Sequence, residues 1–270
     1  MVIHVNPNVK FSYNIAKGSS QQRIDAVGEI TDKLCDKIIP HIHNDSIKVD
    51  DFKSLIKSVL PESKVVKITP VKTTKDYCGE SDYIYGKHNE VIGQTIGIPF
   101  KRGKIKSTDI PVCIHEFVHV LDTLFNPKYV ARTNKMNMHD QYNNNYDKCF
   151  DILYHHETCK TPKEKEEVLT NVRKSVIHAL TGRSKEDKIN LIQELRNEMQ
   201  TEYNAYKAES FYAKKLNKAG VTIDKDSLKD YSSDYMFKEK GDLLKQIGLE
   251  LVADSRKSIS KKQRKNNAIL

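Results

Sequence analysis

The sequence predicts an α+β fold that is mostly helical and contains one small mixed sheet. Two observations predict this class. Over most of the 270 residues, apolar side chains recur every three or four positions, which is typical of amphipathic helices. Between about residues 64 and 98 the period changes, and the segment is rich in β-branched residues and tyrosine, as strands are. The length provides ample chain for a hydrophobic core.

The elements are expected in the following order along the chain. Residues 1–18 are polar and mixed, which predicts an extended or disordered start. Helices are predicted at 21–39, 51–60 with Asp50 as N-cap, 162–180, 185–219 and 241–253, and strands at 64–71, 82–86, 91–98 and 221–223. The motif Thr161-Pro162-Lys163-Glu164 is a capping box with proline at the first helical position, and Ser184 to Asp187 repeats the device.

A further helix is predicted over the stretch PVCIHEFVHVLDTL, from Pro111 to Leu124. Asp109 is a suitable N-cap, Pro111 lies in the first turn, and Asn126-Pro127 ends the helix about four turns later. One face of this helix is apolar and consists of Cys113, Ile114, Phe117, Leu121 and Leu124. The opposite stripe contains histidines and acidic residues, so we expect it to face a cleft.

The polar stripe of this helix has the pattern His-Glu-x-x-His. His115 and His119 stand one helical turn apart, so their imidazole nitrogens can converge on one metal ion. Glu116 projects beside that ion, where a carboxylate can take a proton from a bound water. Asp122 is expected to hold an imidazole tautomer. HExxH on a helix is the signature of zinc-dependent peptidases.

A zinc ion held by two histidines needs a third protein ligand, and the predicted helix 185–219 offers one. One stripe of this helix is apolar at its start and carries carboxylates further on, among them Glu202. A buried, unpaired carboxylate costs free energy, so we expect Glu202 to face a cation. Glu198 and Glu209 are the competing ligands. The alternative for the whole stripe is a solvated acidic face balanced by neighbouring lysines, namely Lys207, Lys214 and Lys215.

HExxH followed by Glu202-Tyr203-Asn204-Ala205 resembles the gluzincin branch of the zincin metallopeptidases. The resemblance implies a zincin-like fold, with His115, His119 and Glu202 as zinc ligands and Glu116 as general base. It also implies that the strand before the HExxH helix is an exposed edge to which an extended substrate adds. Residues 91–98 are the candidate edge, where Gly93 and Gly97 would permit close backbone approach. The glycine and third histidine of metzincins have no counterpart after HExxH.

The resemblance implies a zinc endopeptidase that uses one zinc ion per chain and acts on specific proteins. Tyr206 is the candidate that stabilises the oxyanion, with Tyr203 as the alternative; the competing interpretation is that either tyrosine packs in the core. A minimal zincin core in a Lys-, Asn- and Ile-rich chain also resembles secreted bacterial effector proteases, which cleave host cytosolic proteins. The competing hypotheses are a house-keeping peptidase, a protease of a phage or mobile element, and a non-catalytic helical binding or scaffold module with an incidental HExxH.

The domain organisation expected on this basis is consecutive. Residues 1–62 form an N-terminal helical segment, 63–240 a zincin-like metalloprotease core, and 241–270 a C-terminal helix with a basic tail. The start of the chain lacks the basic and apolar regions of a signal peptide, and no apolar run is long enough to span a membrane. This predicts a protein of the cytosol, or one that a bacterium secretes into a host cytosol by another route.

Composition bears on the remaining partners. The five cysteines are scattered without a CxxC pair and are expected to be reduced thiols; a second metal site from Cys149, His155 or His156 and Cys159 matches no standard zinc spacing. The net charge is +9, but the sequence contains no tryptophan, phosphate-binding loop or recognition-helix pattern. We therefore expect a protein substrate and no nucleic-acid partner. The sequence does not indicate an oligomeric state.

Overall fold

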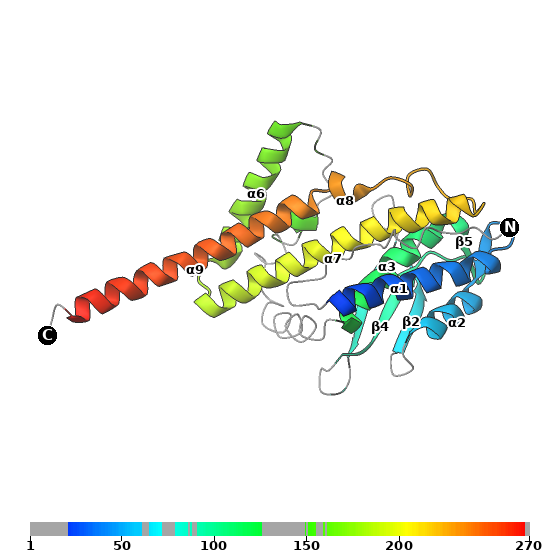
Figure 1. Ribbon diagram of the computed structural model, residues 1–270, viewed down its shortest axis with the longest axis horizontal. Helices are drawn as coiled ribbons and strands as arrows, with labels where there is room; N and C mark the ends of the chain where they lie inside the picture. The colour runs from blue at the N-terminus through cyan, green and yellow to red at the C-terminus, as the bar shows by residue number, and fades with distance from the viewer. Residues whose placement is uncertain are drawn as a thin grey trace. The chain divides into compact units, whose positions relative to one another are not determined.

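The computed structural model describes residues 21–60, 65–71, 79–85, 87, 91–125, 149, 151–154, 159 and 161–267. Helices predominate, and the strands form two small sheets, so the predicted mostly helical α+β class is confirmed (Figure 1). The chain divides into two compact units. Residues 1–130 with 201–232 make the first, and residues 131–200 with 233–270 make the second.

The first unit is built on one hydrophobic core. Its helices are α1 (Gln21–Ile38), α2 (Val49–Val59), α3 (Ile110–Phe125) and the part of α7 (Lys185–Lys218) that follows residue 200. Each of these helices contributes to the same cluster, for example through Leu34, Phe52, Phe117 and Tyr212. The helices expected in the N-terminal segment 1–62 therefore pack into one core with the HExxH helix.

The main sheet has three described strands, β2 (Val65–Pro70), β3 (Glu80–Tyr85) and β4 (Val91–Ile98). Their order is β2-β4-β3, with β4 parallel to β2 and antiparallel to β3 (Figure 1 labels β2 and β4). The predicted hairpin is confirmed, but the prediction that 91–98 is an edge strand is wrong, because β4 is paired on both sides. Gly97 also has another use: the side chain of Glu80 occupies the space where its Cβ would stand.

A second sheet leads the chain into α3. It consists of β1 (Ser46–Lys48) and β5 (Lys104–Lys106), which pair antiparallel and which the sequence did not predict. The short 3-10 helix η2 (Ser107–Asp109) follows β5 directly, and α3 begins at the next residue. Asp109 thus precedes the helix as predicted, whereas Asp50 lies inside α2, whose N-cap is Lys48.

The helices of the second unit match the sequence patterns closely. In α6 (Pro162–Leu180) the capping box is confirmed: the Glu164 amide donates to Thr161 Oγ1 at 3.2 Å and the Thr161 amide donates to Glu164 Oε2 at 2.9 Å. The predicted helix 241–253 lies within the longer α9 (Phe237–Asn267). None of the helices in the described part of the chain is long and apolar enough to cross a membrane.

The segment between α7 and α9 corrects one predicted strand. Residues 221–223 are irregular, and the short helix α8 (Tyr231–Asp234) follows them. Val221 and Ile223 are nevertheless buried, because they join the core of the first unit. Apolar alternation there reflects burial of two side chains by a loop rather than pairing with another strand.

Candidate metal centre

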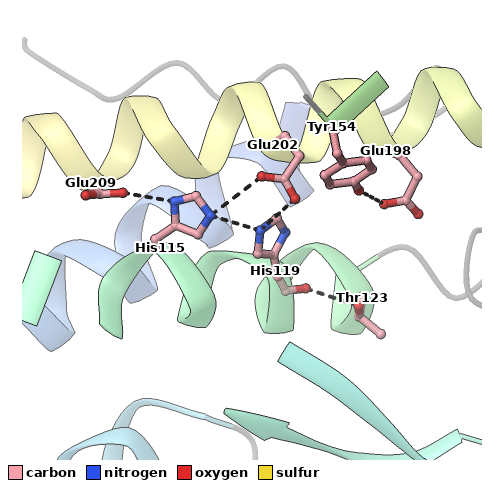
Figure 2. A network of polar contacts seen from close by, with 7 residues as sticks. All are labelled: His115, His119, Thr123, Tyr154, Glu198, Glu202 and Glu209. Carbon is pink, nitrogen blue, oxygen red and sulfur yellow. Dashed lines mark hydrogen bonds and ion pairs between the residues drawn. The ribbon is translucent and has the colours of Figure 1, made fainter. Parts of the chain in front are cut away.

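Two histidines of α3 face α7 (Figure 2). His115 and His119 are four residues apart, which places their side chains one above the other on the helix. Their Nε2 atoms lie 3.3 Å apart. The other side of α3 is anchored in the core by residues with no exposed surface, among them Ile114, Phe117 and Leu121. The apolar face thus lies in the core as the sequence predicts, whereas the histidine stripe faces α7 and its position in a cleft stays a prediction.

The third member of the site comes from α7, which lies far from α3 in the sequence. Glu202 Oε1 lies 3.3 Å from His119 Nε2, and Glu202 Oε2 lies 3.6 Å from His115 Nε2 (Figure 2). One atom from each of the three side chains falls within 4.8 Å of the other two. In the described part of the chain, this is the group of His, Cys, Asp and Glu side chains that could hold a metal ion.

The spacing of these donor atoms suits a zinc ion. In a tetrahedral site with ligand distances of about 2.0 to 2.1 Å, neighbouring ligand atoms stand about 3.4 Å from each other. The two Nε2 atoms lie 3.3 Å apart, and they lie 3.3 and 3.6 Å from the two different oxygens of the Glu202 carboxylate, which is close to this spacing. Two imidazoles and one carboxylate are also one of the ligand sets of catalytic zinc sites, which leave the fourth position for water or substrate.

Glu209 orients the first histidine. Its Oε2 lies 3.1 Å from Nδ1 of His115, on the side of the ring away from Glu202 (Figure 2). With the Nδ1 proton donated to this carboxylate, the Nε2 lone pair points towards His119 and Glu202. The sequence offered Glu209 as a competing ligand; the structure places it behind the histidine instead. The corresponding role expected for Asp122, which is 2% exposed, stays a prediction.

The other competing ligand has a different partner. Glu198, one turn before Glu202 on α7, accepts a hydrogen bond from the Tyr154 hydroxyl at 2.7 Å. Glu198 does not belong to the group of converging donors. Among the three glutamates that the sequence left open, Glu202 is the one that the structure brings to both histidines.

The acidic stripe of α7 is not a solvated face. The side chains of Glu202 and Glu209 are only 13% and 15% exposed. Two of the lysines expected to balance them pair elsewhere. Lys215 bonds Asp32 at 3.2 Å and Asp36 at 2.8 Å on α1, and Lys207 lies 3.9 Å from Asp230. The structure therefore contradicts the alternative in which this stripe faces water.

Burial and the neighbouring carboxylates together set the electrostatics of the site. It raises the pKa of Glu116, which is 6% exposed, to about 7; His115 opposes this rise, and the nearby carboxylates add to it. Burial also lowers the pKa of His119 to about 4. Burial would lower the pKa of His115 as well, but hydrogen bonds with Glu202 and Glu209 raise it well above its usual value. Several carboxylates share this buried space, and a bound cation would offset their charge.

The two candidate tyrosines occupy different surroundings. The ring of Tyr206 stands edge-on to the imidazole of His115, with centroids 4.5 Å apart. Tyr203 instead has Lys207 Nζ 5.2 Å from its ring centroid. Tyr206 is therefore the tyrosine that the structure places beside the histidines, as the sequence favoured. Its role in catalysis stays a prediction.

A buried polar chain supports α3 from the sheet. Gln94 of β4 is 3% exposed and donates from Nε2 to Thr123 Oγ1 at 3.0 Å. The Thr123 hydroxyl donates in turn to the backbone oxygen of His119 at 3.1 Å. The sequence gave no signal for this link, because Gln94 and Thr123 lie on different elements and neither fits a motif. It ties the turn of α3 that carries His119 to the middle strand.

No family model, curated protein or solved structure matches this chain. Its chemistry therefore follows from the side chains in the site. Two imidazoles and the Glu202 carboxylate converge as donors, and the Glu209 carboxylate fixes one of the imidazoles. A third carboxyl group, that of Glu116, is buried on the helix that carries the histidines and has a pKa near neutrality. Such a set can bind a divalent ion and transfer a proton beside it.

Proposed function

We propose that this protein is a zinc-dependent peptidase that holds a single zinc ion through His115, His119 and Glu202. The convergence of three side chains carries the proposal, because it joins two helices distant in sequence: the two Nε2 atoms lie 3.3 Å apart, and each lies 3.3 or 3.6 Å from one oxygen of Glu202. The Glu209 contact supports it further, since it leaves the Nε2 lone pair of His115 available to a metal. The order of HExxH and a glutamate on a later helix agrees with a zincin-like fold.

Glu116 is the proposed general base and acid. A bound zinc ion would act as a Lewis acid, lowering the pKa of a coordinated water and polarising the peptide carbonyl. Glu116 accepts the proton that the attacking water loses and returns it to the leaving amine nitrogen as the peptide bond breaks. A pKa of about 7 suits both transfers, because the carboxyl group can then gain and lose a proton near neutral pH.

Tyr206 is the proposed hydrogen-bond donor to the developing oxyanion. Its ring packs edge-on against His115, which brings this side chain to the site rather than to another face of α7. A phenol that donates to the former carbonyl oxygen would stabilise the negative charge formed in the transition state.

The proposed substrate path follows β3. This strand lies at one end of the described order β2-β4-β3, where an added strand can lie beside it. The backbone of its preceding residue, Gly79, reaches the side chain of Glu116. An extended peptide that pairs with an exposed edge presents its backbone at regular intervals, which suits an endopeptidase acting on a protein segment.

The proposed wider role is that of a bacterial effector that cleaves host proteins.

Metal analysis tests the site directly. Protein purified without added zinc should contain about one zinc ion per chain, and His115→Ala and Glu202→Ala should lose it. Glu198→Ala is the matched control on the same helix and should keep the metal, because Glu198 pairs with Tyr154. A wild type that stays metal-free after zinc titration would instead favour the binding or scaffold module.

Cleavage tests the reaction. Zinc-loaded wild type incubated with a complex protein mixture should generate new peptide termini detectable by mass spectrometry. Glu116→Gln should retain zinc but lose at least about 100-fold in cleavage rate, since it cannot take up the proton. Equal cleavage by this variant would remove Glu116 from the mechanism.

A further inference from the structure

We infer that Gly79 is a positioning residue for Glu116: its missing side chain makes the space in which the Glu116 side chain lies. Gly79 precedes β3 and was not singled out by any motif. The packing itself does not depend on zinc or on any activity. Its consequence for catalysis rests on the proposed function, in which Glu116 transfers the proton.

The geometry leaves no room for a Cβ at position 79. A Cβ built there would lie 2.7 Å from Glu116 Oε1, 2.9 Å from Glu116 Cγ and 2.9 Å from Val112 Cγ1. Each distance is below the contact distance of about 3.5 Å or more that non-bonded carbon atoms prefer. Two of the three obstructing atoms belong to Glu116, so the backbone of Gly79 forms one wall of the Glu116 site.

Backbone conformation does not explain this glycine. Gly103, Gly182 and Gly220 have φ values between +71° and +87°, where side chains are strained, but the φ of Gly79 lies outside that region. An alanine at position 79 would therefore meet no backbone strain. What excludes it is the neighbouring helix, and chiefly the glutamate.

Glu116 cannot make room by moving its carboxylate alone. One of the obstructing atoms is Cγ, whose position is set by χ1. In a helix, χ1 has two common staggered wells, so avoiding a Cβ at position 79 requires a change of well or a shift of the strand. A changed χ1 carries both carboxylate oxygens away, whereas the three atoms nearest to such a Cβ include none from His115, His119 or Glu202.

A double-mutant cycle tests the packing without a substrate. The melting temperatures of wild type, Gly79→Ala, Glu116→Ala and the double variant are compared in zinc-free buffer. Gly79→Ala should lower the melting temperature by several degrees in wild type and by clearly less in the Glu116→Ala background, because Cγ and Oε1 are then absent. The entropic effect of Gly→Ala on the unfolded chain is common to both backgrounds and cancels.

Each outcome of the cycle either supports or overturns the inference that Gly79 makes room for Glu116. An equal loss in both backgrounds overturns the inference, as does a wild-type-like Gly79→Ala. If Gly79→Ala fails to fold, a folded double variant supports the inference and an unfolded one overturns it. Gly241→Ala is the matched control, since a Cβ there would stand 3.8 Å from the Cβ of Met199, in ordinary contact.

Metal content and cleavage then test the consequence. Gly79→Ala should keep zinc as wild type does, with proteolysis of the protein mixture reduced at least about 100-fold, as expected when a general base is misplaced. Loss of zinc, or cleavage at the wild-type rate, contradicts the positioning role. A wild type without zinc or cleavage would refute the proposed function, while the melting cycle would still decide what Gly79 does.

Discussion

His115 uses both nitrogens of its ring, one towards Glu209 and the other towards His119 and Glu202. Glu209→Gln should weaken zinc binding by about 10- to 100-fold, because an amide holds the Nδ1 proton less strongly than a carboxylate does. Competition with a chromogenic chelator measures this affinity. Glu186→Gln, in the exposed first turn of the same helix, is the control. Unchanged affinity in Glu209→Gln would show that this contact does not tune the site.

The raised pKa of Glu116 predicts a pH dependence of stability for chelator-treated protein. Between pH 4.5 and about 7 this carboxyl group keeps its proton in the folded state and loses it in the unfolded state. The unfolded state therefore binds fewer protons, and the stability contributed by this group falls as pH rises. Relative to Glu116→Gln, the wild-type free energy of unfolding should fall by up to about 3 kcal/mol across this window.

Urea unfolding of both proteins at pH 4.5 and 7.5 measures the difference. A difference that does not change with pH would mean that Glu116 titrates at its ordinary value in the folded protein.

At the scale of elements, the contact between the sheet and α3 includes a buried hydrogen bond that runs through one hydroxyl. Thr123→Val keeps the shape of the side chain but leaves the Gln94 amide without its acceptor in a buried place. This should cost about 1 to 3 kcal/mol in the free energy of unfolding, measured with denaturant. Thr123→Ser retains the hydroxyl and should cost clearly less. Equal losses in the two variants would point to packing rather than to the hydrogen bond.

Elements with a strong local period were predictable, and those defined by distant pairing were not. The helices α1, α2, α3, α6 and α7 begin and end within about two residues of the predicted positions, because caps, prolines and apolar spacing are local signals. The strands β1 and β5 are very short and pair across a long intervening stretch of chain, so no local signal marks them. The edge position expected for β4 came from the resemblance to zincins, and the pairing of β4 with both β2 and β3 corrects it.

The site divides in the same way. The His115 and His119 pair lies on a single helix, and its geometry follows from a spacing of four residues. The roles of Glu202, Glu209 and Glu198 depend on how α7 lies on α3, which the sequence left open. The role inferred for Gly79 is harder to predict from sequence, because it depends on contact with Glu116 of α3 and not on the residues next to Gly79 in the chain.

At the scale of the whole molecule, the candidate ligands all lie in the first unit although α7 continues into the second. Zinc should therefore slow amide hydrogen exchange in residues 110–125 and 201–209, and should have little effect in α6. Mass spectrometry of exchange with and without zinc measures this. His119→Ala should show no zinc-dependent protection. Equal protection throughout both units would mean that they open together.

The placement of Glu202 and Glu209 on one helix also limits how the gene can change. They are seven residues apart, so they face the same way after about two turns of 3.6 residues. A substitution between them alters one side chain, whereas a single inserted or deleted codon rotates Glu209 by about 100° relative to Glu202. Over evolution, substitutions in this segment should therefore be tolerated more often than insertions or deletions. Distant descendants of this gene should then keep the seven-residue spacing between the two glutamates even where the residues between them differ.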